Sequence, residues 1–158
     1  MANYNPSTQA RIADINAGMR VVKATSSCAA TADVDLFTVS GGKVLLLGLV
    51  GECDGAMEAA ATTILIKHVV DGTDTPLSIA SGSLSEKAVD TMLTLPAAVG
   101  SGLVVSTGEG AAILSAAPVY VLQPGDLKMT VGAATNTGTI TWTLWYVPAE
   151  DGAYVEAA

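Results

Sequence analysis

The sequence predicts an all-β fold: a single β-sandwich or jelly roll, with an N-terminal arm and a short C-terminal tail. Three observations indicate this. Short runs of aliphatic and β-branched residues recur about every ten residues. Turn-forming glycine, proline, asparagine and aspartate separate the runs. The last long run, residues 139–147, alternates polar and apolar side chains with the period of a strand. A chain of 158 residues fits one domain plus arms.

We divide the chain into three parts. Residues 1–25 are expected to form an arm and a first strand, residues 26–148 the sandwich domain, and residues 149–158 a tail. The arm has weak helical spacing across Thr8–Ala17, where Ser7 or Thr8 could cap a short helix. The first strand is expected over Met19–Thr25, because Val21 and Val22 lie at its centre.

Strands of the first half follow from apolar runs and their bounding turns. Ser40 to Lys43 contains paired glycines, which supply the positive φ of a tight turn, and predicts a hairpin. The nearly all-aliphatic run after it is typical of a central strand with both faces covered. The strands expected here are residues 34–39, 44–53 and 62–70, and residues 71–76 are expected to be a turn.

The second half begins with a less regular stretch, in which serine, glycine and alanine interrupt short apolar pieces. Its expected strands are residues 77–80, 88–95, 102–106, 118–122 and 127–131. Gln123 to Asp126 and Asn136 to Gly138 are turns. In the closing strand, 139–147, residues 140, 142, 144 and 146 face one way, whereas three threonines and Trp145 face the other.

The balance of apolar and charged residues predicts a subunit built for assembly. Hydrophobic residues make up 50% of the chain and charged residues only 14%, against about 25% charged in a typical soluble domain. No apolar run approaches the roughly 20 residues of a membrane-spanning helix. We therefore expect much of the surface to face other protein.

Charge is distributed unevenly along the chain. The net charge is −8 and the isoelectric point about 4.3, which disfavours nucleic acid and anionic membranes as partners. Arg11, Arg20 and Lys23 against Asp14 give residues 1–25 a charge of +2, and the remainder carries −10. This predicts an arm that lies on an acidic neighbour, such as another copy; a chance distribution of so few charges is the alternative.

Catalytic and cofactor chemistry is not indicated. His68, the single histidine, lies within an apolar run with no nucleophile-turn motif, which favours a packed or interface histidine over a catalytic triad. Asp71 to Asp74 invites a calcium site but lacks a complete ligand pattern, so an ordinary turn is favoured. We expect no enzyme, no cofactor, no metal and no small-molecule substrate.

Cys28 and Cys53 are expected to be free thiols packed as small hydrophobic residues. The polar residues Met1 to Pro6 are not followed by the apolar segment of a signal peptide, so we expect synthesis in a reducing cytoplasm, where disulfides are rare. Two cysteines and one histidine are too few ligands for a zinc site.

The threonine row at residues 139, 141 and 143 ends in Trp145. Threonine suits a solvated outer face with high β propensity, and a contact between subunits is the alternative. An exposed indole favours the contact, because tryptophan is enriched at interfaces. The candidate interface residues are therefore Arg11, Arg20, Lys23 and Trp145.

Two stretches resemble small virion proteins of tailed bacteriophages. The first runs from Ala32 to Glu52 and continues at Ala60–Ile64; the second runs from Asn136 to Pro148. Their strand–Gly-Gly–strand unit and closing Thr/Trp strand are similar to those of capsid cement, or decoration, proteins. The resemblance implies a jelly-roll homotrimer on the outer surface of the phage head, made in the bacterial host cytoplasm, that clamps neighbouring major capsid subunits.

The sequence is also compatible with two other functions. A structural β-subunit of the phage tail or baseplate is expected to have the same strand pattern. A glycan-binding β-sandwich would need exposed aromatic residues close to aspartate and asparagine, and the sequence offers only Trp145, Tyr146 and Tyr154 as candidates.

Overall fold

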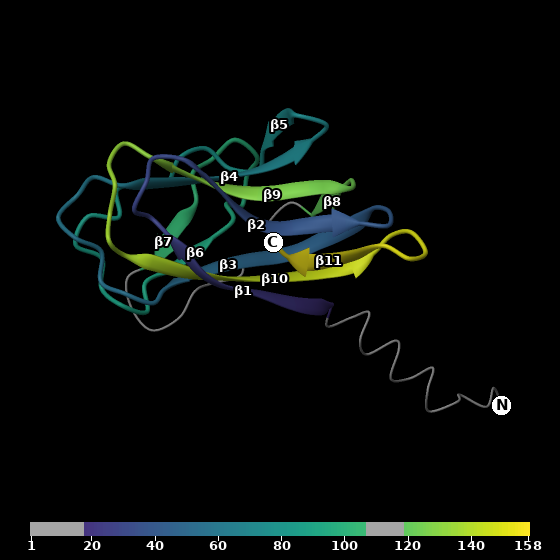
Figure 1. Ribbon diagram of the computed structural model, residues 1–158, viewed down its shortest axis with the longest axis horizontal. Coiled ribbons are helices and arrows are strands. Elements are labelled where there is room, and N and C mark those ends of the chain that lie inside the picture. Colours follow the sequence, from purple (N-terminus) through teal and green to yellow (C-terminus); the bar gives the residue numbers. More distant parts are fainter. Residues whose placement is uncertain (1–17, 107–118) are drawn as a thin grey trace, which may run out of the picture.

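A computed structural model describes residues 18–106 and 119–158, and these residues form an all-β sandwich (Figure 1). This confirms the predicted all-β sandwich. No helix is present in these two ranges. The helix expected across Thr8–Ala17 lies outside them. The strands of the first half are β1 (Met19–Ser27), β2 (Asp33–Ser40), β3 (Val44–Cys53), β4 (Thr63–Val70) and β5 (Thr73–Pro76). Those of the second half are β6 (Met92–Thr94), β7 (Val104–Ser106), β8 (Tyr120–Leu122), β9 (Gly125–Gly132), β10 (Thr139–Pro148) and β11 (Tyr154–Ala157).

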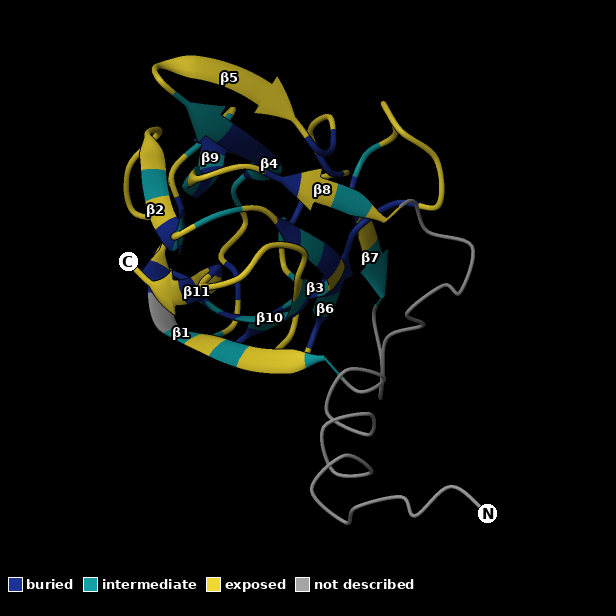
Figure 2. Ribbon diagram, turned by 90° about the vertical axis from the view of Figure 1, so that its right-hand side faces the viewer, coloured by how far each residue is buried: buried dark blue, intermediate teal, exposed yellow. Residues whose placement is uncertain are grey.

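The strands form two antiparallel sheets that pack face to face. Sheet A has the order β1-β10-β3-β6-β7, with β8 paired to the same edge of β3 as β6. Sheet B has the order β11-β2-β9-β4-β5. Viewed end-on in Figure 2, the buried segments of both sheets face one another and the exposed strand β5 lies at an outer edge. The apolar core therefore lies between the sheets.

The turn at Ser40–Lys43 does not form the predicted hairpin. It joins β2, which pairs with β9 and β11 in sheet B, to β3, which lies in sheet A. Gly41 and Gly42 do adopt positive φ, 74° and 148°, so the local turn was identified correctly. The predicted pairing of the two flanking strands was wrong. A turn determines only the local reversal of the chain, whereas burial of the apolar faces selects the partner of each strand.

The long strands show the alternation read from the sequence. Along β10, Ile140, Trp142, Leu144 and Tyr146 are buried and the intervening residues are half-buried. The central position predicted for β3 is confirmed, because β10 lies on one side of it and β6 and β8 on the other. Its second face is not covered, however: Leu47 is exposed, and Leu45, Val50 and Glu52 are only half-buried.

Neither end of the domain is bounded as expected. β1 continues past residue 25 to Ser27 and pairs with β10, so it belongs to sheet A. Within the expected tail, Tyr154–Ala157 forms β11 and pairs with β2. Val155 is 6% exposed and joins the core. A single buried valine gave too weak a periodic signal to predict this strand.

The middle of the chain departs most from expectation. Asp71 and Gly72 alone make the turn, with φ of 49° and 77°, and residues 73–76 return as β5. Residues 77–80 are not a strand; instead Ser78 Oγ accepts a hydrogen bond from Ile66 N at 3.1 Å, and Ser81 Oγ accepts one from Ile64 N at 3.0 Å. These hydroxyls accept hydrogen bonds from the backbone N–H groups of β4 that do not pair with β5. The strands expected at 88–95 and 102–106 shorten to β6 and β7.

Candidate functional site

The two sheets differ sharply in the charge that they carry. In sheet A, the only charged residues within strands are Arg20, Lys23 and Glu52. In sheet B they are Asp33, Asp35, Lys67, Asp74, Asp126, Lys128 and Glu156. The low content of charged residues in the sequence therefore falls mainly on the strands of sheet A.

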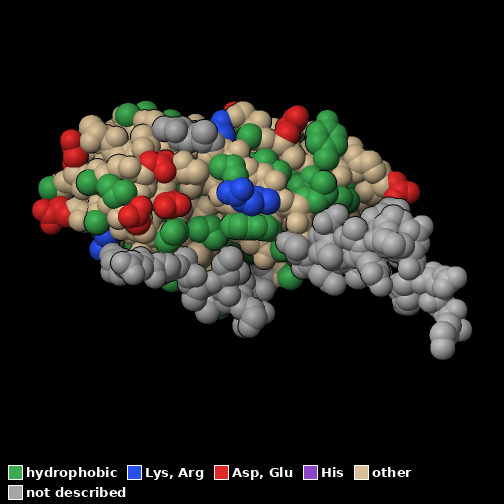
Figure 3. Space-filling model, turned by 90° about the horizontal axis from the view of Figure 1, so that it is seen from below, with side chains coloured by type: hydrophobic (Ala, Val, Ile, Leu, Met, Phe, Trp, Pro, Cys, Tyr) green, Lys and Arg blue, Asp and Glu red, His purple; other side chains and the backbone are tan. Residues whose placement is uncertain are grey.

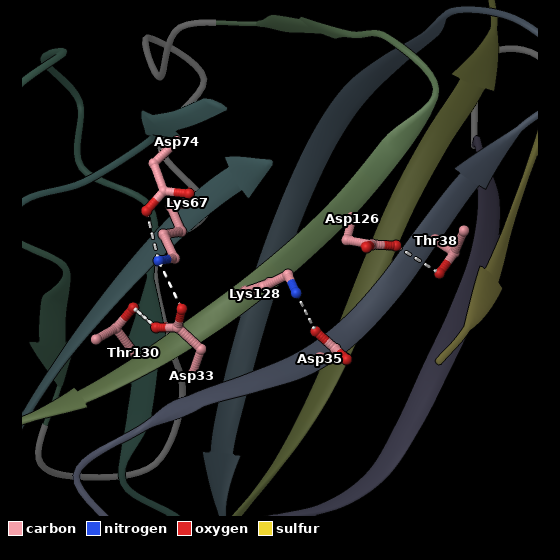
Figure 4. A network of polar contacts seen from close by, with 8 residues as sticks. All are labelled: Asp33, Asp35, Thr38, Lys67, Asp74, Asp126, Lys128 and Thr130. Atoms are coloured by element: carbon pink, nitrogen blue, oxygen red, sulfur yellow. Dashed lines mark hydrogen bonds and ion pairs between the residues drawn. The ribbon is translucent and has the colours of Figure 1, made fainter. Parts of the chain in front are cut away.

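The outer face of sheet B carries a network of paired polar side chains (Figure 4). Lys67 Nζ lies 2.7 Å from Asp33 Oδ2 and 2.6 Å from Asp74 Oδ2. Thr130 Oγ1 donates a hydrogen bond of 2.7 Å to Asp33, and Lys128 Nζ lies 2.8 Å from Asp35 Oδ1. Because these charged side chains pair with one another and remain partly exposed, this face is compatible with contact with solvent.

These contacts shift the pKa values of Asp33, Lys67 and Lys128 in the directions expected for ion pairs. Hydrogen bonds from Lys67 and Thr130 lower the pKa of Asp33. The hydrogen bonds to Asp33 and Asp74 raise the pKa of Lys67, and the one to Asp35 raises the pKa of Lys128. Asp33, Lys67 and Lys128 are therefore charged near neutral pH, and the network holds strands of sheet B together.

The outer face of sheet A is largely apolar. Its members occupy the strand positions that alternate with the buried core, and several are well exposed: Val22 is 39%, Leu47 37% and Val121 58% exposed. We define the outer face of sheet A as Arg20, Val22, Leu45, Leu47, Val50, Glu52, Val121, Thr139, Thr141, Thr143, Trp145 and Val147. In Figure 3, viewed from the side of β1 and β10, hydrophobic side chains run across the middle and most acidic ones gather toward the left-hand end.

Trp145 lies near the middle of this face. Its register partners are Arg20 on β1 and Gly48 on β3. A Cβ built at Gly48 would lie 3.7 Å from Cε3 of Trp145, so the indole lies beside the bare backbone of this glycine. The neighbouring Leu47 is the extra residue where the register of β3 shifts against β10. The glycine thus leaves room for a large aromatic side chain to lie against the sheet.

The four interface residues expected from the sequence are not all brought together. Arg20 is exposed and adjacent to Trp145 on the outer face of sheet A. Lys23 is half-buried, lies in register with the core residue Trp142, and donates a hydrogen bond to the backbone oxygen of Ala158. Arg11 lies outside the described residues. The structure therefore groups two of the four.

The sequence reasoning missed the part of this face that β3 and β8 contribute. The run Val44–Cys53 was expected to be buried on both sides, so Leu45, Leu47 and Val50 were assigned to the core. One signal could have corrected this: Glu52 is a carboxylate near the end of an aliphatic run, and a carboxylate without a partner marks a face open to solvent.

The aromatic residues proposed for glycan binding do not share a surface. Tyr146 is 2% exposed and belongs to the core, and Tyr154 lies on β11 in sheet B. Only Trp145 is on the outer face of sheet A. No group of three or more His, Cys, Asp or Glu residues within the described ranges could hold a metal ion, and no helix there is long and apolar enough to cross a membrane.

The remaining candidate residues have structural roles. His68 is 5% exposed, and its Nε2 lies 3.0 Å from the carbonyl oxygen of Gln123; burial lowers its pKa. It supports the crossing from β8 to β9, as expected of a packed histidine. Cys28 and Cys53 are buried free thiols, which confirms that prediction. Asp74 binds Lys67, and Asp71 belongs to the β4–β5 turn.

Comparison with protein-family models, with curated proteins and with solved structures finds no match for this chain. An open sheet face with apolar side chains, threonines and few charges is suited to contact with another protein, because covering it releases water from apolar area at little electrostatic cost.

Proposed function

We propose that this chain is a structural virion protein: a capsid cement protein that binds the outer surface of a tailed-phage head as a homo-oligomer and clamps neighbouring major capsid subunits. The observation that carries the proposal is the outer face of sheet A, which has only Arg20 and Glu52 as charged residues. A subunit whose function is to add buried contact area needs such a face, and it needs no catalytic group.

The proposal also includes the jelly-roll variant of the sandwich. Support comes from the strand order, in which β1-β10-β3-β6 in one sheet faces β2-β9-β4-β5 in the other. The chain passes from one sheet to the other at each connection from β1 to β4, and again between β5 and β6, β8 and β9, β9 and β10, and β10 and β11. Jelly rolls are built from two such sheets with Greek-key connections.

The distribution of charge over the two sheets agrees with a location of the protein on the surface of a particle. Most charged side chains on the outer face of sheet B are paired with one another and partly exposed to water. This face can therefore remain exposed while the outer face of sheet A is covered. The net charge of −8 makes binding to packaged nucleic acid unfavourable. The resemblance implies three copies in the oligomer, and the mass of the purified protein measures this number.

The test is uptake of the purified protein by purified coat shells. We expect the shells to bind it at a fixed ratio to coat subunits, as measured by sedimentation of the shells and quantification of both proteins. Thr143→Lys, on the outer face of sheet A, should reduce uptake by at least about tenfold because it buries an unpaired charge. Thr63→Lys, a half-buried threonine on a strand of sheet B, is the matched control and should leave uptake unchanged.

Two outcomes would contradict this proposal in different ways. Binding to isolated tails or baseplates, with none to heads, would favour the tail-subunit alternative. Binding to neither particle would remove a virion role altogether.

A further inference from the structure

Within the described part of the chain, the outer face of sheet A carries one positive and one negative side chain, Arg20 and Glu52. The side chains of Arg20 and Glu52 make no hydrogen bond or ion pair within residues 18–106 and 119–158. The other charges on strands that face outward are largely paired, as in the network of sheet B. A second surface with the complementary arrangement could pair with both charges.

The register of the strands places these two charges symmetrically about Thr143. Arg20 is opposite Trp145, two residues along β10 from Thr143 in one direction. Glu52 is opposite Thr141, two residues from Thr143 in the other direction. β1 and β3 flank β10 on its two sides. From strand spacing and rise, the two charges lie roughly 16 Å apart on a diagonal with Thr143 at its midpoint.

We propose that the outer face of sheet A packs against the same face of a second copy of this chain across a two-fold axis that passes over Thr143. A rotation about this axis exchanges the two ends of the diagonal. It places Arg20 of each copy opposite Glu52 of the other, so the face is complementary to itself. An isologous contact requires this self-complementarity.

The remaining side chains suit the same contact. Thr143 of the two copies meets on the axis, where a small side chain is needed. Trp145 of one copy lies over the region of Val50 of the other, so aromatic and aliphatic groups cover each other. Asp54, whose carboxylate accepts a hydrogen bond of 2.6 Å from Thr141, adds negative charge near Glu52 and strengthens the attraction for Arg20 of the second copy.

A head-to-tail contact is less favourable with these faces. It would press the apolar face of one copy on the outer face of sheet B of the next, and would remove the Lys67 network from water at a desolvation cost. The two-fold contact leaves that network exposed on both copies. It therefore predicts an even number of copies, which differs from the three that the resemblance implies. It does not depend on the phage assignment, and because it occupies the face assigned above to the shell, a given copy makes one of these two contacts at a time.

The test is a charge exchange measured by analytical ultracentrifugation of the full chain. The wild type should sediment as an even-numbered oligomer. Arg20→Glu and Glu52→Arg should each weaken association by at least about tenfold, because each sets like charges opposite one another. The double variant Arg20→Glu/Glu52→Arg restores opposite charges at these two positions and should associate at least about threefold more tightly than either single variant. Asp54 stays beside position 52 and repels the new carboxylate of the second copy, so association should remain weaker than in the wild type. Glu156→Arg, on strand β11 of sheet B, is the matched control and should change nothing.

A monomeric wild type or a three-copy mass would overturn the proposal. So would single variants that associate normally, or a double variant that stays as weak as the singles. Circular dichroism of every variant checks the fold, and because Arg20 and Glu52 are exposed or half-buried, we expect the variants to keep the wild-type spectrum.

Discussion

Lys67 on β4 and Asp33 on β2 form an ion pair of 2.7 Å, although β9 lies between their strands. In register, Lys67 is opposite Lys128 of β9, and Asp33 is opposite Thr130. The lysine therefore reaches diagonally across β9 and also holds Asp74 on β5 (Figure 4). One side chain thus ties three strands of sheet B together.

Replacing Lys67 by methionine should destabilise the fold by about 1–2 kcal/mol, because two charged hydrogen bonds are lost while both carboxylates remain accessible to water. Urea unfolding followed by tryptophan fluorescence measures the change. Lys128→Met removes a single ion pair, with Asp35, and should cost less. An equal cost for the two variants would contradict the view that Lys67 joins several strands.

The same network predicts a pH dependence of stability. The pKa of Asp33 is lowered in the folded state, whereas in the unfolded chain it is about 3.9. The unfolded chain therefore binds more protons between these values, and stability falls as pH falls. The contribution of Asp33 is complete above about pH 5 and is lost as the pH drops through about 4 toward the folded pKa.

Asp33→Asn should therefore lose less of its free energy of unfolding between pH 7 and pH 3 than the wild type does. Urea titrations at the two pH values measure this difference. Asp151→Asn, in the exposed turn before β11, is the control and should follow the wild type. Identical pH dependence in the wild type and Asp33→Asn would show that this carboxylate contributes nothing.

Gly51 lies beneath the central tryptophan of the core. A Cβ at this position would meet Trp142 Cζ3 at 2.8 Å and Ile140 Cγ2 at 3.0 Å. Both neighbours are fully buried, so they cannot move aside easily. Gly51→Ala should therefore destabilise the protein by about 1–3 kcal/mol through overpacking.

Gly82→Ala provides the comparison, because nothing lies within 4 Å of the Cβ that it would add. Thermal unfolding monitored by circular dichroism should show a lower Tm for Gly51→Ala and a nearly unchanged Tm for Gly82→Ala. A wild-type Tm for Gly51→Ala would mean that the core around Trp142 has room that the packing does not show.

The two thiols should be inert in the folded protein. Burial raises the pKa of both Cys28 and Cys53 to about 11, and the thiolate is the reactive form. We expect an aromatic disulfide reagent at pH 7.5 to modify them only after urea unfolds the chain. Thr137→Cys adds a thiol at an exposed position and should react at once under the same conditions. Rapid labelling of the wild type without denaturant would contradict this burial.

Much of the fold was already determined by local sequence signals. The alternation of residues 139–147 predicted both the strand β10 and its buried face, because a period of two is a property of the strand itself. The turn residues likewise located nearly every long strand to within a few residues. Trp145 was an interface candidate because strand alternation placed it on the face opposite the core, and Arg20 because it belongs to the basic N-terminal segment.

The partner of each strand and the face that it buries were decided only by the tertiary structure. The Gly41–Gly42 turn gives no information on whether β2 and β3 share a sheet, since that depends on which distant strands bury their apolar sides. Val44–Cys53 reads as uniformly aliphatic, so only the position of sheet B shows which half of its side chains is covered. The short strand β11 and the hydroxyls of Ser78 and Ser81 depend on partners far along the chain or on a neighbouring edge. The sequence by itself thus determined a β-rich chain with fewer charged residues than a typical soluble domain. The packing of the two sheets decided that the outer face of sheet A is the one with few charges, because packing selects which side chains are buried.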